Sequence, residues 1–339
     1  MRICLLGGYS GVPDEAMRKI SREVAERLSG KNQVLTLDLK RIYRLSFWQQ
    51  MRSFSPDIIH YIPGPSIKSF MILRLASIFC GNCKTIMFAV HPDIPYLLRE
   101  VIRFIQPDLL LVQSYQTDLI LRRLGCKTDF FPLGVDIEKF KPVSYETKQN
   151  LRIKYGVDTD KFVLLHIGSI KSGRNVQILN KIQKYDCQVL LVGSISVGVD
   201  TKLLEELIDS RCIIIDRYID AIEEVYALAD CYIFPTLNSY DHFGRSTAKS
   251  IEIPLTVLEA MACNLPVIAT SFGGLPYLFQ EGNGLIFVEK EVDIHQALEL
   301  VKKDVTPNTR NMVLKCSWEV LVKQLESVYI TLVNDRGVD

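Results

Sequence analysis

The sequence predicts an α/β protein built from two doubly wound units, each a parallel sheet with helices on both faces. Three observations support this prediction. The chain has 339 residues, which is long for one ordinary domain. Short apolar runs alternate with segments of helical pattern through residues 1–140, as in parallel sheets. A polar stretch, residues 138–150, then interrupts this alternation, and the alternation restarts after it. We therefore interpret residues 138–150 as a linker.

The first half is expected to contain six strands and at least four helices. The strand candidates are short and apolar, and the helix candidates between them are longer and amphipathic. The strands are expected at residues 3–6, 34–37, 58–62, 85–90, 109–112 and 128–132. The helices are expected at residues 14–28, 67–79, 94–104 and 116–124.

The second half repeats this pattern and ends in an amphipathic helix, residues 317–333. Strands are expected at residues 162–167, 188–192, 212–215, 231–234, 267–270 and 285–288. Helices are expected at residues 176–184, 203–209, 221–229 and 255–262. The polar segment 237–250 is long for a strand-to-helix connection, which indicates a functional loop.

Composition limits the function classes. Hydrophobic residues make up 48% of the chain and charged residues 23%, as in globular proteins. Residues 1–150 carry 21 Lys and Arg against 14 Asp and Glu, a net charge of +7, whereas the rest carries −6. This asymmetry suits an anionic ligand or membrane surface on the first half. It lacks the dense basic stripe of a nucleic-acid binder, so we expect no nucleic-acid partner.

The chain begins directly with a strand-like run and shows no signal peptide, and no apolar run is long enough to span a bilayer. Its nine cysteines are scattered through apolar runs, as in a reducing compartment. Cys80 and Cys83 form a lone CxxC without a second pair, which disfavours zinc. We expect a cytoplasmic protein, with peripheral contact at the inner membrane face as a further hypothesis.

The stretch 250–271 combines a helix start with a carboxylate one turn later. Pro254 opens a helical run, and proline is well tolerated at that position. The free amides at Leu255 and Thr256 would attract an anion, and Glu259 follows one turn later. Amides for phosphate and a carboxylate for sugar hydroxyls would suit a nucleotide. The alternative is a surface helix with a solvated glutamate.

Two loops that follow strands are further candidates. Gly7 and Gly8 follow the first strand, where glycine allows a backbone to approach a phosphate; a flexible turn is the alternative. Lys171 and Arg174 follow the first strand of the second half and precede a helix. Two cations there could clamp a diphosphate and stabilise the leaving group, and a solvated basic loop is the alternative.

The five histidines show no metal-ligand spacing. His91 ends an apolar run and is followed by Pro92, so it is either a ligand of a sugar hydroxyl or a turn histidine. His60 and His166 lie inside strand candidates, and His166 is expected to be a core residue.

The segment Leu258-Glu259-Ala260-Met261-Ala262, followed by Pro266-Val267-Ile268, resembles the signature of retaining nucleotide-sugar glycosyltransferases of family 4, the glycosyl transferases of group 1. That family has the GT-B fold. The resemblance implies two Rossmann-like domains facing across a cleft, with the C-terminal helix crossing back to the first domain. The implied domains are residues 1–140 plus 317–339, on the acceptor side, and residues 151–316, which bind the nucleotide sugar.

The resemblance also implies roles for single residues. Gly7, Gly8, Lys171, Arg174, Leu255, Thr256 and Glu259 would bind the donor, with Glu259 on the ribose. His91 and Glu252 would contact the donor sugar at the catalytic centre. The family pattern places its first glutamate eight residues before the second, but Ile251 stands there and Glu252 comes one residue later. No metal and no other cofactor is expected.

The implied function is transfer of a sugar, with retention of configuration, from a nucleotide-diphosphate sugar to a sugar, lipid-linked or small-molecule acceptor. One alternative is a binding module that keeps the nucleotide but has lost transfer, and another is a GT-B sugar-nucleotide epimerase. Residues 40–54 are basic with interleaved aromatics, which suits either a helix on an anionic membrane or an ordinary helix packed on the sheet.

Overall fold

A computed structural model of the chain describes residues 1–12, 15–81, 83–90, 99–183, 187–193, 198–238, 248, 250–304 and 306–335. The chain divides into two compact units. Unit 1 comprises Met1–Leu133, Tyr240–Ile253 and Trp318–Asp339, and unit 2 comprises Gly134–Ser239 and Pro254–Ser317. The segment 240–253, which the sequence analysis assigned to the second domain, is therefore grouped with unit 1.

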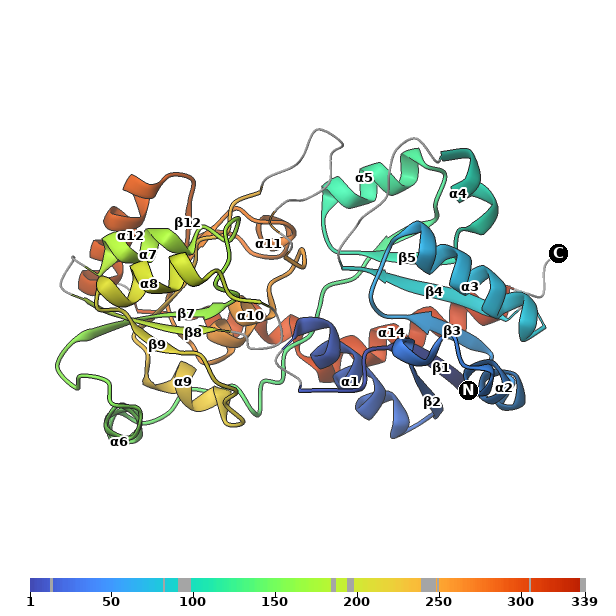
Figure 1. Cartoon of the computed structure of the whole chain (residues 1–339), viewed down its shortest axis with the longest axis horizontal. Helices are drawn as coiled ribbons and strands as arrows, with labels where there is room; N and C mark the ends of the chain where they lie inside the picture. Colours follow the sequence, from blue (N-terminus) through green and yellow to red (C-terminus); the bar gives the residue numbers. More distant parts are fainter. Residues whose placement is uncertain are drawn as a thin grey trace. The chain divides into compact units, whose positions relative to one another are not determined.

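Unit 1 contains one sheet of six parallel strands in the order β2-β1-β3-β4-β5-β6 (Figure 1). The central strands are buried on both faces, which explains their nearly continuous apolar sequences. The strands are β1 (Arg2–Gly7), β2 (Gln33–Asp38), β3 (Ile58–Tyr61), β4 (Lys84–Ala89), β5 (Leu109–Val112) and β6 (Thr128–Phe130).

The helices of unit 1 cover this sheet. Four of them contribute to one core cluster with the sheet: α2 (Leu45–Phe54), α3 (Ile67–Phe79), α4 (Arg99–Ile105) and α5 (Tyr115–Arg123). The short helix η1 (Leu39–Arg41) precedes α2, and α1 (Ala16–Ser29) packs against β1, β2 and the C-terminal helix. The predicted helix 67–79 coincides with α3.

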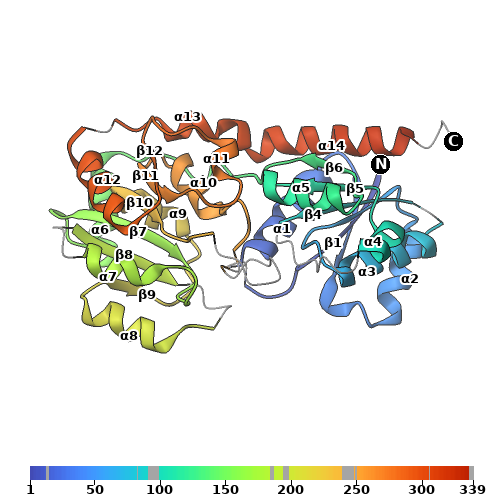
Figure 2. The same cartoon turned by 90° about the horizontal axis from the view of Figure 1, so that it is seen from above.

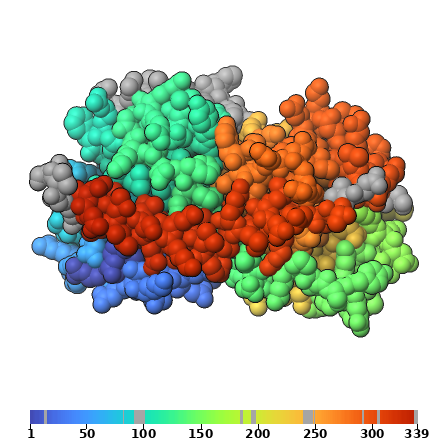
Figure 3. All heavy atoms as spheres, turned by 180° about the vertical axis from the view of Figure 1, so that it is seen from behind, coloured from blue at the N-terminus to red at the C-terminus, as the bar shows by residue number. Residues whose placement is uncertain are grey.

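The C-terminal helix α14 (Trp318–Asn334) follows the last element of unit 2 but belongs to unit 1 (Figure 2). Its inner side is tied to the unit by Tyr329, whose hydroxyl lies 2.5 Å from Nδ1 of the buried His60. Glu326 accepts a hydrogen bond from Asn32 over 2.7 Å. Figure 3 shows α14, in red, at the molecular surface. The expected return of the last helix to the first domain is thus confirmed.

Unit 2 contains a second six-stranded parallel sheet, in the order β12-β11-β10-β7-β8-β9. The chain winds outward from β7 in one direction and from β10 in the other, so the winding reverses between these two strands. The strands are β7 (Phe162–Gly168), β8 (Cys187–Gly193), β9 (Ile213–Ile215), β10 (Cys231–Phe234), β11 (Val267–Thr270) and β12 (Leu285–Val288).

Helices also cover the sheet of unit 2. One core cluster joins the sheet to η3 (Val176–Ile178), α7 (Leu179–Ile182), α8 (Thr201–Asp209) and α12 (Glu291–Asp304). A second group packs together: α6 (Tyr145–Tyr155), α9 (Ile222–Leu228), α10 (Leu255–Ala262) and α13 (Thr309–Val313). The short helices α11 (Leu275–Leu278) and η4 (Leu314–Cys316) complete the unit. Two doubly wound units are confirmed.

The interpretation of residues 138–150 as a linker is wrong from Tyr145 onward, where α6 begins. Ser144 caps this helix by accepting a hydrogen bond from the Thr147 amide, and Gly156 ends it in the left-handed region at φ 67°. The sequence of α6 is polar because only Arg152 among its residues is buried. The helix therefore has no apolar periodicity from which it could be predicted.

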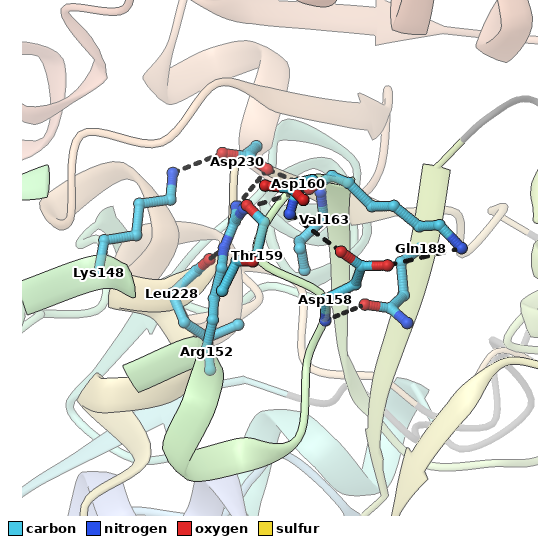
Figure 4. Close-up of polar contacts among 10 residues, drawn as sticks. Lys148, Arg152, Asp158, Thr159, Asp160, Val163, Gln188, Leu228 and Asp230 are labelled. Atoms are coloured by element: carbon cyan, nitrogen blue, oxygen red, sulfur yellow. Dashed lines mark hydrogen bonds and ion pairs between the residues drawn. The ribbon is translucent and has the colours of Figure 1, made fainter. Parts of the chain in front are cut away.

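Arg152 joins α6 to the amino ends of β7 and β10 (Figure 4). Its guanidinium donates to the carbonyl oxygens of Leu228, Thr159 and Lys161 over 3.0–3.1 Å, and to Asp230 Oδ2 over 2.5 Å. Asp230 also accepts from Lys148 Nζ at 2.5 Å and from the Val163 amide at 2.7 Å. This network, which we call the Asp230 cluster, fixes α6 to unit 2.

None of the helices within the described ranges combines the length and apolarity that crossing a bilayer requires. All nine cysteines are free thiols, and all except the partly exposed Cys80 are buried.

Candidate functional site

The strand-reversal point of unit 2 carries the basic loop that the sequence singled out. Arg174 follows β7, and its carbonyl oxygen accepts a hydrogen bond from Thr236, which follows β10. Asn175 donates to the Pro235 carbonyl over 3.1 Å, so the loop is fixed to the ends of both strands. Doubly wound sheets bind ligands at such a reversal, beyond the carboxyl ends of the strands.

Lys171 and Arg174 share one turn of this loop, because the Arg174 amide donates to the Lys171 carbonyl over 3.2 Å. Lys171 and Arg174 are both partly buried. Burial lowers the pKa of Arg174 from its usual value, and the nearby Tyr232 opposes this shift. An arginine held in a partly desolvated place interacts with an anion more strongly than one in water.

Two buried residues beside Arg174 were not expected to belong to a site. The Tyr232 hydroxyl donates to the Ile167 carbonyl over 3.3 Å, and its ring stacks on His166 at 6.5 Å between centroids. Burial lowers the pKa of His166 to about 4, and the charge of Arg174 contributes. His166 is a core residue, as expected, but its Nε2 has no partner among the described residues. No pattern in the sequence around His166 indicates that it lies near Arg174.

Helix α10 begins beside the same tyrosine. Pro254 is its N-cap, and no side chain in the described part of the chain caps it. The first-turn amides of Leu255 and Thr256 precede any intrahelical acceptor. Burial raises the pKa of Tyr232, and the neighbouring Thr256 side chain opposes this shift, so the start of α10 lies near the hydroxyl that contacts the end of β7.

Glu259 lies on the second turn of α10 and is 5% exposed. Its Oε2 accepts a hydrogen bond from the Tyr226 hydroxyl over 2.8 Å. The pKa of Tyr226 is raised, mainly by burial and to a smaller extent by the negative charge of Glu259. Tyr232 interacts electrostatically with both Glu259 and Arg174. Three predicted donor-binding residues, Arg174, Thr256 and Glu259, therefore lie near Tyr232. Lys171 and Leu255 are their neighbours in the same loop and in the same helix turn.

Gly7 and Gly8 lie in unit 1, where close packing explains Gly7. A Cβ on Gly7 would come to 2.4 Å from Ser21 Oγ. The following amides, of Tyr9 and Ser10, donate to Asp38 Oδ2 over 3.2 and 2.8 Å. Burial would raise the pKa of Asp38, but these bonds and one from the Lys40 amide lower it. The loop therefore binds an internal carboxylate.

Glu252 also lies in unit 1. Its Oε1 accepts hydrogen bonds from Ser114 Oγ at 2.8 Å and Thr117 Oγ1 at 2.5 Å, and its amide donates to the Val90 carbonyl. Oε2 is buried and has no partner within the described ranges. Burial raises the pKa of Glu252 to about 7, although the two hydroxyls act in the opposite direction. We call this group the Glu252 cluster.

His91 lies outside the described residues, as does most of the loop 237–250. Within the described ranges, no three His, Cys, Asp or Glu side chains come close enough together to hold a metal ion.

Comparisons with known proteins show a family match in unit 2 and similarity to glycosyltransferases over most of the chain. Residues 162–303 match the family described as Glycosyl transferases group 1. The chain is 25% identical over 270 residues to a sulfoquinovosyl transferase of Arabidopsis thaliana, covering 72% of this chain and 49% of that protein. It is 21% identical over 338 residues to an alpha-galactosylglucosyldiacylglycerol synthase of Streptococcus pneumoniae, covering 93% and 83%. The chain spans about half the length of most curated relatives that it matches.

Solved structures show the same fold over the whole length. Anabaena HepE, solved in complex with UDP and glucose, superposes with a TM-score of 0.75 at 16% identity, covering 98% of this chain and 100% of HepE. Residues 162–303 are thus similar to the glycosyl transferases of group 1, the chain resembles curated glycosyltransferases over most of its length, and it has the GT-B fold of two Rossmann-like units.

Proposed function

We propose that this chain transfers a sugar from a nucleoside-diphosphate sugar to an acceptor hydroxyl. The observation that carries the proposal is the position of Arg174 and the start of α10 around Tyr232, at the strand reversal of unit 2. A cation and free helix amides at that place suit a diphosphate. The match of residues 162–303 to the glycosyl transferases of group 1 supports the same substrate class.

In this proposal Arg174, Lys171 and the amides of Leu255 and Thr256 hold the diphosphate and stabilise the charge that develops on it. Glu259 holds the ribose hydroxyls, and Tyr226 fixes its carboxylate. Asp38 occupies the amides that follow Gly7 and Gly8, so donor contact there would come from the glycine backbone itself.

The reaction is proposed to proceed with retention and without a metal. The acceptor oxygen bonds to the anomeric carbon as the bond to the phosphate breaks, and a phosphate oxygen takes the acceptor proton on the same face. His91 and Glu252 are the proposed contacts to the sugar, and no covalent nucleophile is required. Turnover should be unchanged by a metal chelator, and a turnover that needs added divalent cation would contradict this part of the proposal.

The acceptor is a hydroxyl on a sugar, a lipid or a small molecule. The name of the pneumococcal relative places a diacylglycerol in that protein's product. A lipid-borne hydroxyl is therefore the first acceptor to test.

Calorimetric titration with UDP, GDP and ADP tests the site. We expect Arg174→Ala to weaken binding of the preferred nucleotide by about tenfold or more, because a charged hydrogen bond contributes about 1.5–3 kcal/mol. Arg174→Lys keeps the charge but loses the two-pronged geometry, so an intermediate affinity is expected. Glu259→Ala should also weaken binding.

Lys202→Ala, an exposed cation on α8 of the same unit, is the matched control and should bind like the wild type. Equal affinities in all these variants would contradict the placement of the site. Slow hydrolysis of the matching nucleotide sugar would separate a transferase from a module that only binds the nucleotide.

A further inference from the structure

Helix α3 of unit 1 exposes a row of apolar side chains. Its inner side, with Phe70, Leu73 and Ala76, is buried in the core. Met71, Leu75 and Ile78 lie on the outer side at helical spacing, and they are 50%, 55% and 56% exposed. An apolar row on the outer side of a helix is unusual, because such positions are normally polar.

The only other exposed residues of α3 are basic, Lys68 and Arg74. Lys68 Nζ lies 5.5 Å from the ring centroid of Tyr43, which is 86% exposed, so this ring adjoins the start of α3. We define the α3 surface as Tyr43, Lys68, Met71, Arg74, Leu75 and Ile78. Helix α4 packs beside α3 and exposes Phe104 as well (Figure 1).

The three helices η1, α2 and α3 carry charge of one sign. Helices η1, α2 and α3 are described completely and contain no aspartate or glutamate. They carry Lys40, Arg41, Arg52, Lys68 and Arg74, and Arg44 precedes α2. An apolar row whose own helix carries only cations is complementary to an anionic surface with an apolar interior.

The sequence left residues 40–54 as either a helix on an anionic membrane or an ordinary helix packed on the sheet, and the structure buries the centre of that stretch. Phe47 and Met51 lie in the core. Trp48 packs on Phe79 at 6.0 Å between centroids and donates to the Ile42 carbonyl over 2.8 Å. Most aromatic side chains of residues 40–54 therefore support α3 from inside, and the exposed apolar row belongs to α3.

We propose that the α3 surface docks unit 1 on an anionic phospholipid bilayer. Met71, Leu75 and Ile78 enter the headgroup region, and Tyr43 lies at its boundary. Lys68 and Arg74 extend their charges to lipid phosphates along aliphatic stems. A second copy of the chain fits this surface less well, because its cations would face cations.

The inference rests on unit 1 alone and does not require the proposed activity. One consequence does rest on the proposed function: α2 and α3 begin near the carboxyl ends of β2 and β3, so docking would bring that edge of the sheet to a lipid-borne acceptor hydroxyl.

Co-sedimentation with vesicles tests the proposal, using phosphatidylcholine alone and phosphatidylcholine mixed with phosphatidylglycerol. The wild type should bind the mixed vesicles and not the neutral ones. Lys68→Gln with Arg74→Gln should weaken binding about 25-fold, since each cation near the surface contributes about fivefold. Met71→Ser, Leu75→Ser and Ile78→Ser together should weaken it by about tenfold or more.

The matched control replaces three apolar residues of equal exposure on other helices, Ile208→Ser, Leu300→Ser and Ile330→Ser, which are 55%, 55% and 54% exposed. It should bind like the wild type, and circular dichroism should show that all variants are folded. Equal binding of the two triple variants would overturn the proposal, as would a wild type that ignores the mixed vesicles. A wild-type dimer that the α3 triple variant converts to monomer in light scattering would assign the surface to a second copy.

Nucleotide titration of the α3 triple variant separates the two proposals. Its affinity for the preferred nucleotide should be unchanged. A wild type that binds vesicles but no nucleotide would contradict the proposed function and support the docking surface.

Discussion

Asp230 and Glu252 are two carboxylates with little exposure to water, and they differ in how their negative charge is compensated. Asp230, in unit 2, accepts from two cations and a backbone amide, so its charge is compensated. Glu252, in unit 1, accepts from two hydroxyls, and its second oxygen has no partner among the described residues. A compensated carboxylate contributes to stability, whereas an uncompensated one titrates near neutral pH, as is common at functional sites.

Their positions in the two sheets agree with this difference. Asp230 immediately precedes β10 and contacts the start of β7, so the Asp230 cluster lies at the amino end of its sheet. Glu252 contacts Val90 and Ser114, which follow β4 and β5, so it lies at a carboxyl edge. Parallel sheets place chemistry at the carboxyl edge and leave the amino edge to packing.

Arg152→Ala should have the largest effect on this comparison. The substitution removes one of the two cations that bind Asp230, and it also removes the donor to three carbonyl oxygens. We therefore expect the free energy of unfolding of unit 2 to fall by about 3–5 kcal/mol. Both tryptophans lie in unit 1, so tryptophan fluorescence follows that unit while circular dichroism follows both. Urea unfolding should therefore show an early dichroism transition with the fluorescence transition unmoved. A shift in both signals alike would show that the two units unfold together.

Glu252→Gln should have the next largest effect, and it should depend on pH. Burial raises the pKa of Glu252 from 4.5 to about 7, so the folded state binds its proton more tightly than the unfolded chain. The resulting stability is complete below about pH 4.5 and is lost as the pH rises to about 7, a change of about 3 kcal/mol. The variant should match the wild type at pH 4 and exceed its stability at pH 8.

Fluorescence-detected unfolding across this pH range measures the difference for unit 1. Glu205→Gln, at an exposed position of α8, is the control and should follow the wild type at every pH. A Glu252→Gln profile parallel to the wild-type profile would mean that Glu252 is charged and compensated, like Asp230.

Lys148→Ala should have the smallest effect. Its ammonium binds Asp230 at 2.5 Å but remains partly exposed, and Arg152 still compensates the carboxylate. We expect a loss of about 1 kcal/mol that shrinks with added salt. A loss as large as that of Arg152→Ala would show that the two cations act as one unit.

Elements with strong local signals could be predicted from the sequence. Helix α3 and the final helix were located to within a residue, because uninterrupted helical patterns define them. The helix expected at 176–184 proved to be η3 followed by the short α7. Helix α6 could have been found from Ser144 and Gly156, which cap it, had its polar composition not been taken for a linker.

The site was predictable to a smaller extent. Arg174 and the start of α10 stood out because each follows a strand or begins a helix. The neighbours Tyr232 and His166 did not stand out. Both lie inside strands, and the sequence of a strand does not show which end of the sheet a side chain approaches. The contact of Glu252 with Ser114 joins residues 138 positions apart, and no local pattern records such a distance.

The return of α14 to unit 1 has a consequence for synthesis. The ribosome releases the first sheet well before it makes the helix that covers it, because all of unit 2 lies between them in the chain. Until Tyr329 emerges, His60 lacks the hydroxyl to which it is bonded in the finished protein. The nascent first half therefore lacks this contact while the second half is made, and a partly folded unit with uncovered apolar surface is prone to aggregate during that interval.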